Sequence, residues 1–337
     1  MEIARLGRSG LQVSRLALGT MTFGSQMAEP DAIRLLDKAF DVGINFFDTA
    51  EMYAAPAQNE TQGVSEEILG RWLRTKSRHA VVVGSKLNGA GDRPGQPLLP
   101  WIRGGYTALD RHHLIAACEA SLRRLGTDYI DLYQPHWPDR LIPIPEQLAA
   151  MARLVESGKV RYFGLSNDTA WGTTRFCAEA DAAGLPRVVS IQVAYNLLQR
   201  NPEHALAEVC AMERIGFIAF SPLAMGVLTG KYSTGERPAE ARLSKFSRYG
   251  DMYLGDRMVE IADRYVAIAR DHGLSPVKMA YAWVRQQPFV TSVLSSFSKP
   301  EQLQPFIESA QITLSPVILE QLDAIRQLHD ARWNQFG

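Results

Sequence analysis

The sequence has few of the features that direct a protein to a large or charged partner. Its 36 Lys and Arg residues are balanced by 36 Asp and Glu residues, so the formal net charge is zero. Zero net charge gives no electrostatic attraction to nucleic acid or to an anionic membrane. No uninterrupted apolar run approaches the roughly 18 residues that span a bilayer, and the opening MEIARLGRSG lacks the plan of a signal peptide. We therefore expect neither a nucleic-acid nor a membrane partner.

Cysteine is also scarce. Cys118, Cys177 and Cys210 are odd in number and widely spaced, and each lies in a segment with a helical pattern. A disulfide framework would need paired cysteines, and a zinc site would need them clustered. We expect three reduced core thiols, a cytoplasmic protein and no bound metal.

What the sequence does contain is one repeated unit, a short apolar run followed by a longer amphipathic segment. The runs occupy 15–20, 44–49, 80–86, 129–136, 160–167, 188–195, 216–222 and 290–296. Helix-like segments between and after them include 30–42, 110–125, 143–157, 169–183, 201–213 and 299–309. The runs are too uniformly apolar for half-exposed strands, so they indicate a parallel sheet buried on both faces. Eight such units favour an α/β fold of the (β/α)8 TIM barrel type, with residues 1–337 as a single domain.

An open doubly wound sheet is the competing architecture. It usually carries a Gly-rich dinucleotide loop after its first strand, and GTMTFG does not fit that pattern. GAGDRPG at 89–95 has the wrong glycine spacing and contains a proline, so we interpret it as a loop. Four segments exceed the barrel plan. They are an N-terminal hairpin closing the bottom of the barrel, long loops at 88–108 and 222–254 after strands three and seven, and a C-terminal helix at 315–330.

Polar side chains stand at or near the ends of six of the predicted strands. They are Asp48, Lys86, His136, Ser166, Asn167, Gln192 and Ser221. Each alone has an ordinary explanation, such as a helix cap, a turn residue or a solvated lysine. In a barrel, however, all the strand ends meet at one mouth, where the active site is built.

The order of several motifs resembles that of the aldo-keto reductases over nearly the whole chain. They include GRSGLQVSRLALGTMTFG, GINFFDTAEMY, VVVGSK, LRRLGTDYIDLYQPHWPD, GKVRYFGLSN, IQVAYN, FSPLAMGVLTGKY and KPEQL. The chain is most similar to the bacterial and potassium-channel-beta-subunit-like branches. The resemblance implies a barrel fold and NAD(P)(H)-dependent interconversion of carbonyls and alcohols.

Carbonyl reduction needs a hydride on carbon and a proton on oxygen, and a positioned acid can supply the proton without a metal. The resemblance assigns Asp48, Tyr53, Lys86 and His136 to the catalytic tetrad. Tyrosine has a reference pKa of about 10, and a nearby ammonium favours its phenolate. We therefore expect Tyr53 to give the proton, Lys86 to tune it, Asp48 to hold the lysine and His136 to orient the carbonyl.

The resemblance also implies the cofactor contacts. Ser166, Asn167 and Gln192 would hold the nicotinamide carboxamide, Phe220 would stack on its ring, and Ser221, Leu223, Gly226 and Lys231 would wrap the pyrophosphate. The full set expected at the cofactor is Thr20, Met21, Asp48, Ser166, Asn167, Gln192, Phe220, Ser221, Pro222, Leu223, Gly226, Lys231, Arg248, Ser296, Ser298, Lys299 and Gln302.

The last strand departs from the family pattern. A serine replaces a glycine in LSSFSK, and Pro305 and Phe306 replace a Glu-Asn pair. Lys299 is a point charge without the planar fork of arginine. We expect NADP(H) to be preferred, with NAD(H) as the alternative.

The residues expected to contact substrate are Met21, Phe23, Trp101, Tyr106 and Trp137. If they line the pocket, the substrate is a fairly large apolar carbonyl compound, although Trp101 and Tyr106 could equally pack the long loop down. One alternative is a nucleotide-binding, redox-sensing regulatory subunit with little turnover. A metal-dependent hydrolase would need clustered histidines, and only His136 is so placed. We expect a monomer or a small homo-oligomer.

Overall fold

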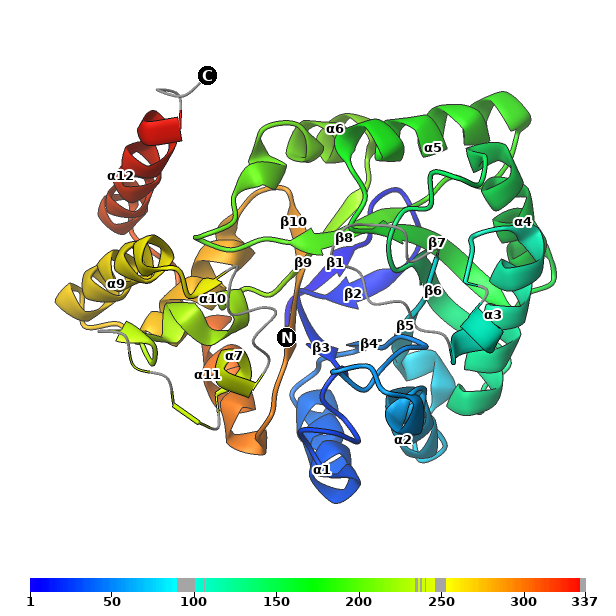
Figure 1. Cartoon of the computed structure of the whole chain (residues 1–337), viewed down its shortest axis with the longest axis horizontal. Helices are drawn as coiled ribbons and strands as arrows, with labels where there is room; N and C mark the ends of the chain where they lie inside the picture. Colours follow the sequence, from blue (N-terminus) through cyan, green and yellow to red (C-terminus); the bar gives the residue numbers. More distant parts are fainter. Residues whose placement is uncertain are drawn as a thin grey trace.

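The structure is a computed structural model, and it describes residues 1–89, 101–105, 107–233, 236, 238–239, 241–245 and 253–333. Eight strands close into a barrel in the order β10-β3-β4-β5-β6-β7-β8-β9 (Figure 1). Every neighbouring pair is parallel. The strands are β3 (Leu16–Gly19), β4 (Phe46–Asp48), β5 (Val82–Leu87), β6 (Ile130–Pro135), β7 (Val160–Ser166), β8 (Ser190–Ala194), β9 (Gly216–Phe220) and β10 (Val290–Ser296). The predicted (β/α)8 barrel is confirmed.

Helices surround the barrel (Figure 1). They are α1 (Glu29–Asp41), α2 (Val64–Leu73), α3 (Arg111–Leu125), α4 (Ile144–Glu156), α5 (Ala170–Ala183), α6 (Leu206–Glu213), α7 (Arg242–Lys245), α9 (Asp256–Asp271), α10 (Pro276–Gln286), α11 (Leu303–Ser309) and α12 (Pro316–Trp333). Their ends follow local chemistry. The Asp110 side chain accepts a hydrogen bond from the His113 N–H at the start of α3, and Gly126 ends that helix in the left-handed region.

The helix predictions need correction in three places. The segment at 201–213 is not one helix, because the short 3-10 turn η4 (Asn201–Glu203) precedes α6. The segment at 299–309 begins as the 3-10 turn η7 (Pro300–Gln302) before α11. The long loop after strand seven contains the 3-10 segment η5 (Ala224–Thr229) and α7. Helices α2, α9 and α10 were not among the segments named from the sequence.

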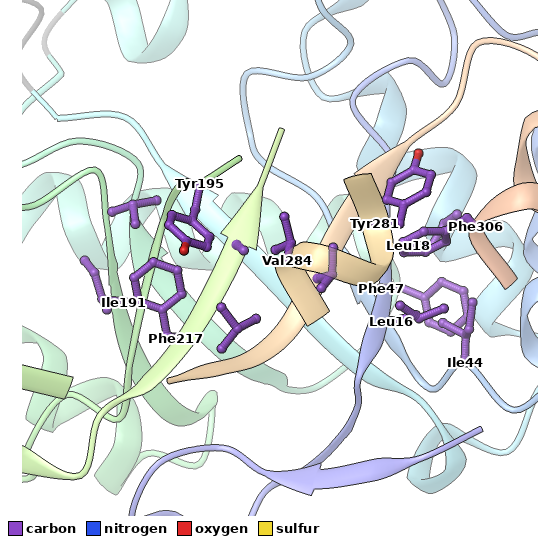
Figure 2. Packing of buried hydrophobic residues seen from close by; sticks show 14 of the residues in the cluster. Leu16, Leu18, Ile44, Phe47, Ile191, Tyr195, Phe217, Tyr281, Val284 and Phe306 are labelled. Atoms are coloured by element: carbon purple, nitrogen blue, oxygen red, sulfur yellow. The ribbon is translucent and has the colours of Figure 1, made fainter. Parts of the chain in front are cut away.

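Strand alternation sorts the apolar side chains into two cores. Leu16 and Leu18 of β3 point outward into the large core between barrel and helices, whereas Ala17 points into the barrel. Figure 2 shows part of the outer core, with Tyr281 and Val284 of α10 among side chains of β3, β4, β8, β9 and α11. Tyr281 and Trp283 are each 1% exposed, so α10 is buried against the barrel.

The predicted N-terminal hairpin is present. β1 (Ile3–Arg5) pairs antiparallel with β2 (Gln12–Ser14). Val13 of β2 and Leu6, which follows β1, pack against the strand side chains that point into the barrel. The hairpin therefore fills one end of the barrel and leaves the other end for function. Among the residues that the structure describes, no helix has the length and hydrophobicity to cross a membrane.

Candidate active site

The same alternation places polar side chains inside the barrel at the carboxyl ends of its strands, the end that we call the barrel mouth. Phe46 belongs to the inner core, so Asp48, two residues later on β4, also points inward. Val82 of β5 is likewise inside, which places Lys86 inside four residues later. The stretch NFFDT therefore contains an inward Phe46, an outward Phe47 and an inward Asp48. The alternation therefore places the carboxylate that ends this apolar strand inside the barrel.

Asp48 and Lys86 form an ion pair inside the barrel. Each residue is 1% exposed, and Lys86 Nζ donates to Asp48 Oδ1 and, at 2.8 Å, to the Thr49 carbonyl oxygen. Burial raises the pKa of Asp48 and lowers the pKa of Lys86, and each charge opposes the shift of the other. Gly84 lies opposite Asp48 on β5, and a Cβ there would come 2.9 Å from Asp48 Oδ2. Glycine therefore leaves room for the carboxylate.

Tyr53 and His136 lie beside this pair. Lys86 Nζ is 5.3 Å from the centroid of the Tyr53 ring, and the rings of Tyr53 and His136 meet edge to face with centroids 5.6 Å apart. The structure thus brings together all four residues that the sequence assigns to catalysis. Tyr53 is partly exposed, whereas Asp48, Lys86 and His136 are buried. The phenol therefore lies nearest to solvent.

The His136 imidazole is held neutral and in a fixed orientation. Burial first, and then the positive charge of Lys86, lower the pKa of His136 well below its usual value of 6.5. The ring stacks on Trp137 with centroids 4.0 Å apart and planes 10° apart. A neutral imidazole can donate one hydrogen bond, and it carries no positive charge near neutral pH.

Two glutamines of the network were not recognised as partners of Asp48. Gln192 Nε2 donates to Asp48 Oδ2 at 3.0 Å, and Gln134 Nε2 lies 3.5 Å from the same oxygen. Gln134 is two residues before His136, so the period of the strand could have identified it as inward-facing. Gln192 was expected to hold a carboxamide, and one of its two amide N–H donors is used by Asp48. Its second N–H and its oxygen remain for a cofactor.

The ends of β7 and β3 add further polar groups. Asn167 has a left-handed backbone with φ 54°, and its Nδ2 donates to the His136 carbonyl oxygen at 3.0 Å and to Ser166 Oγ at 3.3 Å. Thr20 follows β3 and is fully buried. Its backbone N–H donates to the Asp48 carbonyl oxygen at 2.9 Å. Asn167 and Thr20 thus contact the backbone of His136 and of Asp48, and Ser166 is held through Asn167.

The loop after β9 forms a turn built around glycine. Phe220 and Ser221 lie where the strand ends, and Ser221 has a left-handed φ of 54°. Gly226 in η5 has φ 98°, and a Cβ there would lie 2.7 Å from Lys231 Nζ. The Lys231 ammonium therefore approaches backbone that only glycine leaves open.

Arg242 of α7 is a cation that sequence reasoning missed. Burial first, and then the charge of Arg242, lower the pKa of Lys231. Two positive charges thus act at the turn expected to wrap the pyrophosphate. Arg248 was expected at the adenosine end of the cofactor, beside Lys299, and it lies outside the described residues. Arg242 lies in α7, which is only four residues long, and so short a helix has no periodic pattern in the sequence that identifies an inward-facing residue.

Some polar groups of the turn after β10 hydrogen-bond to one another. Gln302 Oε1 accepts the backbone N–H groups of Ser298 at 2.9 Å and Lys299 at 3.3 Å. Lys299 is exposed, whereas Phe306, which replaces a polar residue of the family pattern, is fully buried. Ser296 is partly buried at the end of the strand. Lys299 thus remains available for a charged ligand, but the amide oxygen of Gln302 is engaged.

An apolar wall stands next to Tyr53. Ala50, Met52 and Ile102 form a small buried cluster, and Tyr53, Trp101 and Trp137 pack against it. Met21, also expected at the pocket, is partly exposed. Tyr106 lies outside the described residues.

The expectation for Phe23 is wrong. Its side chain is fully buried in the outer core, and its carbonyl oxygen accepts a hydrogen bond from Ser65 Oγ at 3.0 Å. An aromatic residue in a loop after a strand was interpreted as a rim residue. The turn after β3 instead folds inward, because the Ser65 hydroxyl at the start of α2 binds both the Phe23 and the Thr20 carbonyl oxygens. Tertiary contacts decided its direction.

The described part of the chain contains no group of three or more His, Cys, Asp or Glu side chains that could hold a metal ion. Cys118, Cys177 and Cys210 are buried free thiols. Burial raises the pKa of Cys118 and of Cys210 to about 12 each, so both stay protonated. All three thiols lie in the outer core between barrel and helices.

A closed (β/α)8 barrel with polar side chains gathered at the carboxyl ends of its strands has the layout of a barrel enzyme. A model of the aldo/keto reductase family matches residues 15–327. The chain is 42% identical over 347 residues to Protein tas of Escherichia coli (strain K12), which covers 98% of this chain and 99% of that protein.

It is 32% identical over 346 residues to the versiconal hemiacetal acetate reductase of Aspergillus parasiticus, with 96% of each chain covered. It is also 32% identical over 344 residues to a probable voltage-gated potassium channel subunit beta of Oryza sativa subsp. japonica, over the whole of both chains. The chain belongs to the aldo/keto reductase family. Membership supports an oxidoreductase with a nicotinamide cofactor and NAD(P)H-dependent carbonyl reduction as the general reaction.

Proposed function

We propose that this protein reduces a fairly large, apolar aldehyde or ketone to an alcohol, reversibly, with NADP(H) as preferred cofactor. The observation that carries the proposal is the buried Asp48–Lys86 ion pair beside Tyr53 and His136. Burying two charges costs several kcal/mol per ion before their attraction offsets it. Apolar side chains would pack this position at lower cost, so a buried ion pair beside the partly exposed Tyr53 phenol is better explained by a role in proton transfer.

The residues at the mouth fit a nicotinamide cofactor. Thr20 Oγ1, Thr49 Oγ1 and His136 Nδ1 are buried and have no hydrogen-bond partner among the residues that the structure describes. Buried polar atoms are normally paired, so these three indicate a polar ligand or ordered water. Ser166, Asn167 and the Gln192 oxygen offer donors and an acceptor for a carboxamide, and Phe220 offers an aromatic face.

The charged end of the cofactor would lie along the loop after β9. The turn from Ser221 through Pro222, Leu223 and Gly226 brings backbone close to the Lys231 ammonium. Arg242 adds a second cation, and Lys299 with Ser296, Ser298 and Gln302 lies after the last strand. Lys231 and Arg242 would pair with the pyrophosphate, which both cofactors carry, whereas Lys299 would pair with the 2′-phosphate, which only NADP(H) carries. Lys299 therefore supports a preference for NADP(H) over NAD(H).

When bound, the cofactor supplies a hydride to the carbonyl carbon. Tyr53 donates its hydroxyl proton to the carbonyl oxygen as negative charge develops there. The Lys86 ammonium favours the resulting negative charge on the Tyr53 oxygen, and Asp48 holds that ammonium in place. Neutral His136 donates a hydrogen bond that orients the substrate oxygen. Trp101 and Trp137 form the apolar wall that excludes water and contacts the rest of the substrate.

The test is turnover with purified protein, NADPH or NADH, and a panel of aromatic and aliphatic carbonyls, before and after exhaustive EDTA treatment. We expect reduction with NADPH that EDTA leaves unchanged, because side chains fill every proton-transfer role. Loss of turnover that zinc or magnesium restores would overturn this account. The alternative, a regulatory nucleotide-binding subunit, predicts tight cofactor binding without turnover on any carbonyl. Its support is limited to the likeness to the channel subunits.

A further inference from the structure

A second buried ion pair lies two residues from the proposed proton donor. Glu51 follows β4 and is 2% exposed. One carboxylate oxygen accepts the backbone N–H of Asn88, and the other accepts Arg103 Nη1. The Glu51 backbone N–H donates to the Lys86 carbonyl oxygen at 2.9 Å. Glu51 therefore connects the Tyr53 loop to the end of β5 and to the turn at 101–105.

Arg103 holds the other side of this connection. Its side chain is 14% exposed, and its Nη2 donates to the Asn88 carbonyl oxygen at 2.8 Å, while Nη1 binds Glu51. The planar guanidinium thus binds both partners at once, a geometry that lysine cannot reproduce. The backbone at Arg103 is left-handed, with φ 46° and ψ 39°. A non-glycine residue in this region needs tertiary contacts to hold it there.

The turn that Arg103 holds carries two residues of the apolar wall, Trp101 and Ile102. Ile102, next in sequence, is 1% exposed and packs with Ala50 and Met52 of the Tyr53 loop. Trp101 is partly exposed and packs against the same cluster as Tyr53 and Trp137. The Trp101 Nε1 atom is buried without a partner among the described residues, so packing of the ring fixes its place. The ion pair and the wall belong to one local assembly.

We propose that Arg103 is a positioning residue that, through Glu51, fixes Trp101 beside Tyr53 and so gives the enzyme its selectivity for flat aromatic carbonyls over small aliphatic ones. The inference rests on the proposed function. An aromatic substrate gains contact area against the fixed indole of Trp101, whereas a short aliphatic substrate reaches Tyr53 without touching that indole.

The experiment compares kcat/KM for naphthaldehyde and for propanal in wild type, Arg103→Met, Glu51→Gln and the double variant. Apolar pocket contacts are worth about 10- to 200-fold in discrimination. We expect Arg103→Met to lower the naphthaldehyde-to-propanal ratio by about 10-fold or more, mainly through a higher KM for naphthaldehyde. Because the two residues act as a pair, the double variant should lower the ratio no further than either single variant. Arg103→Lys should restore part of it.

Arg78→Met is the matched control, because Arg78 forms a similarly buried ion pair with Asp131 before β5, away from the barrel mouth. It should lower thermal stability without changing the ratio. If Arg103→Met does not fold, Trp101→Ala tests the same wall without leaving a buried charge. An unchanged ratio in Trp101→Ala or in folded Arg103→Met overturns the inference while wild-type turnover stands. A wild type that reduces neither aldehyde overturns the proposed function itself.

Discussion

The two ends of the barrel interior are built from opposite kinds of side chain. At the end closed by the hairpin, Leu6 and Val13 pack with Ala17, Phe46 and Leu132 in an apolar cluster. At the other end lie a buried ion pair, two glutamines and the hydroxyls of Thr20 and Thr49, which have no hydrogen-bond partner in the part of the chain that the structure describes. The first end lowers the free energy of the fold by removing apolar surface from water. The polar end lowers the net stability, because burying its charged groups costs desolvation free energy.

The largest expected effect comes from removing the Tyr53 hydroxyl at the polar end of the barrel. Tyr53→Phe leaves Asp48, Lys86 and His136 in place and deletes the proposed proton donor. General acid catalysis is worth roughly 10²- to 10⁴-fold, so kcat should fall by at least about 100-fold. Cofactor affinity, measured by fluorescence titration, should change little. Near-normal reduction of a good carbonyl substrate would remove Tyr53 from its role.

The matching change at the apolar end is Leu132→Ala. Leu132 is fully buried in the inner core, and truncation leaves a cavity there. Such changes cost about 2 to 5 kcal/mol of stability. We expect that loss in urea unfolding, with kcat of the folded enzyme close to normal. A stable variant with impaired kcat would show that the two ends are not separable.

A third prediction concerns the charged end of the cofactor. Lys299 is exposed, and one charge-assisted contact is worth about 1.5 to 3 kcal/mol. We expect NADPH to bind roughly 10- to 150-fold more tightly than NADH, with Lys299→Ala removing most of the difference. Raised salt should reduce it too. If titration of both cofactors shows the same ratio in the variant, the 2′-phosphate is bound elsewhere, and Arg248 is the next residue to change. Equal wild-type affinities would mean that the enzyme does not discriminate.

The smallest expected effect is a pH dependence of stability. The pKa of His136 is well below 6.5 in the folded protein, so between 6.5 and its folded value the unfolded chain binds a proton that the folded chain does not. Stability should therefore fall as pH falls below 6.5, by up to about 1.4 kcal/mol per pH unit from this residue. Above 6.5 both states are neutral there, and the contribution vanishes.

His136→Gln provides the comparison, because glutamine does not titrate. Reversible urea unfolding at several pH values should show a shallower acid-side slope in the variant than in wild type. Parallel slopes would mean that His136 binds its proton equally in both states. That result would remove the argument for a neutral imidazole in the site.

Much of the site could be predicted because it depends on two regular features of the chain. Parallel strands gather their carboxyl ends at one mouth, and strand side chains alternate. Asp48, Lys86 and His136 therefore converge although 88 residues separate the first from the last. The helices flanking the strands were predicted less well, and α9 and α10 were not named. Outside the strands, no comparable periodicity ties a residue's number to its direction.

The sequence by itself determined the barrel and the polar strand ends at Asp48, Lys86 and His136, because short-range alternation and the order of the elements encode them. Tyr53 lies in the loop after β4, and its assignment came from the resemblance to the family. Only the tertiary structure placed Phe23 in the core, turned Gln134 and Gln192 toward Asp48, and brought Arg242 to Lys231. The Glu51–Arg103 pair likewise joins residues 52 positions apart. Such pairings depend on loop conformations, which burial and hydrogen bonding fix only once the barrel has closed.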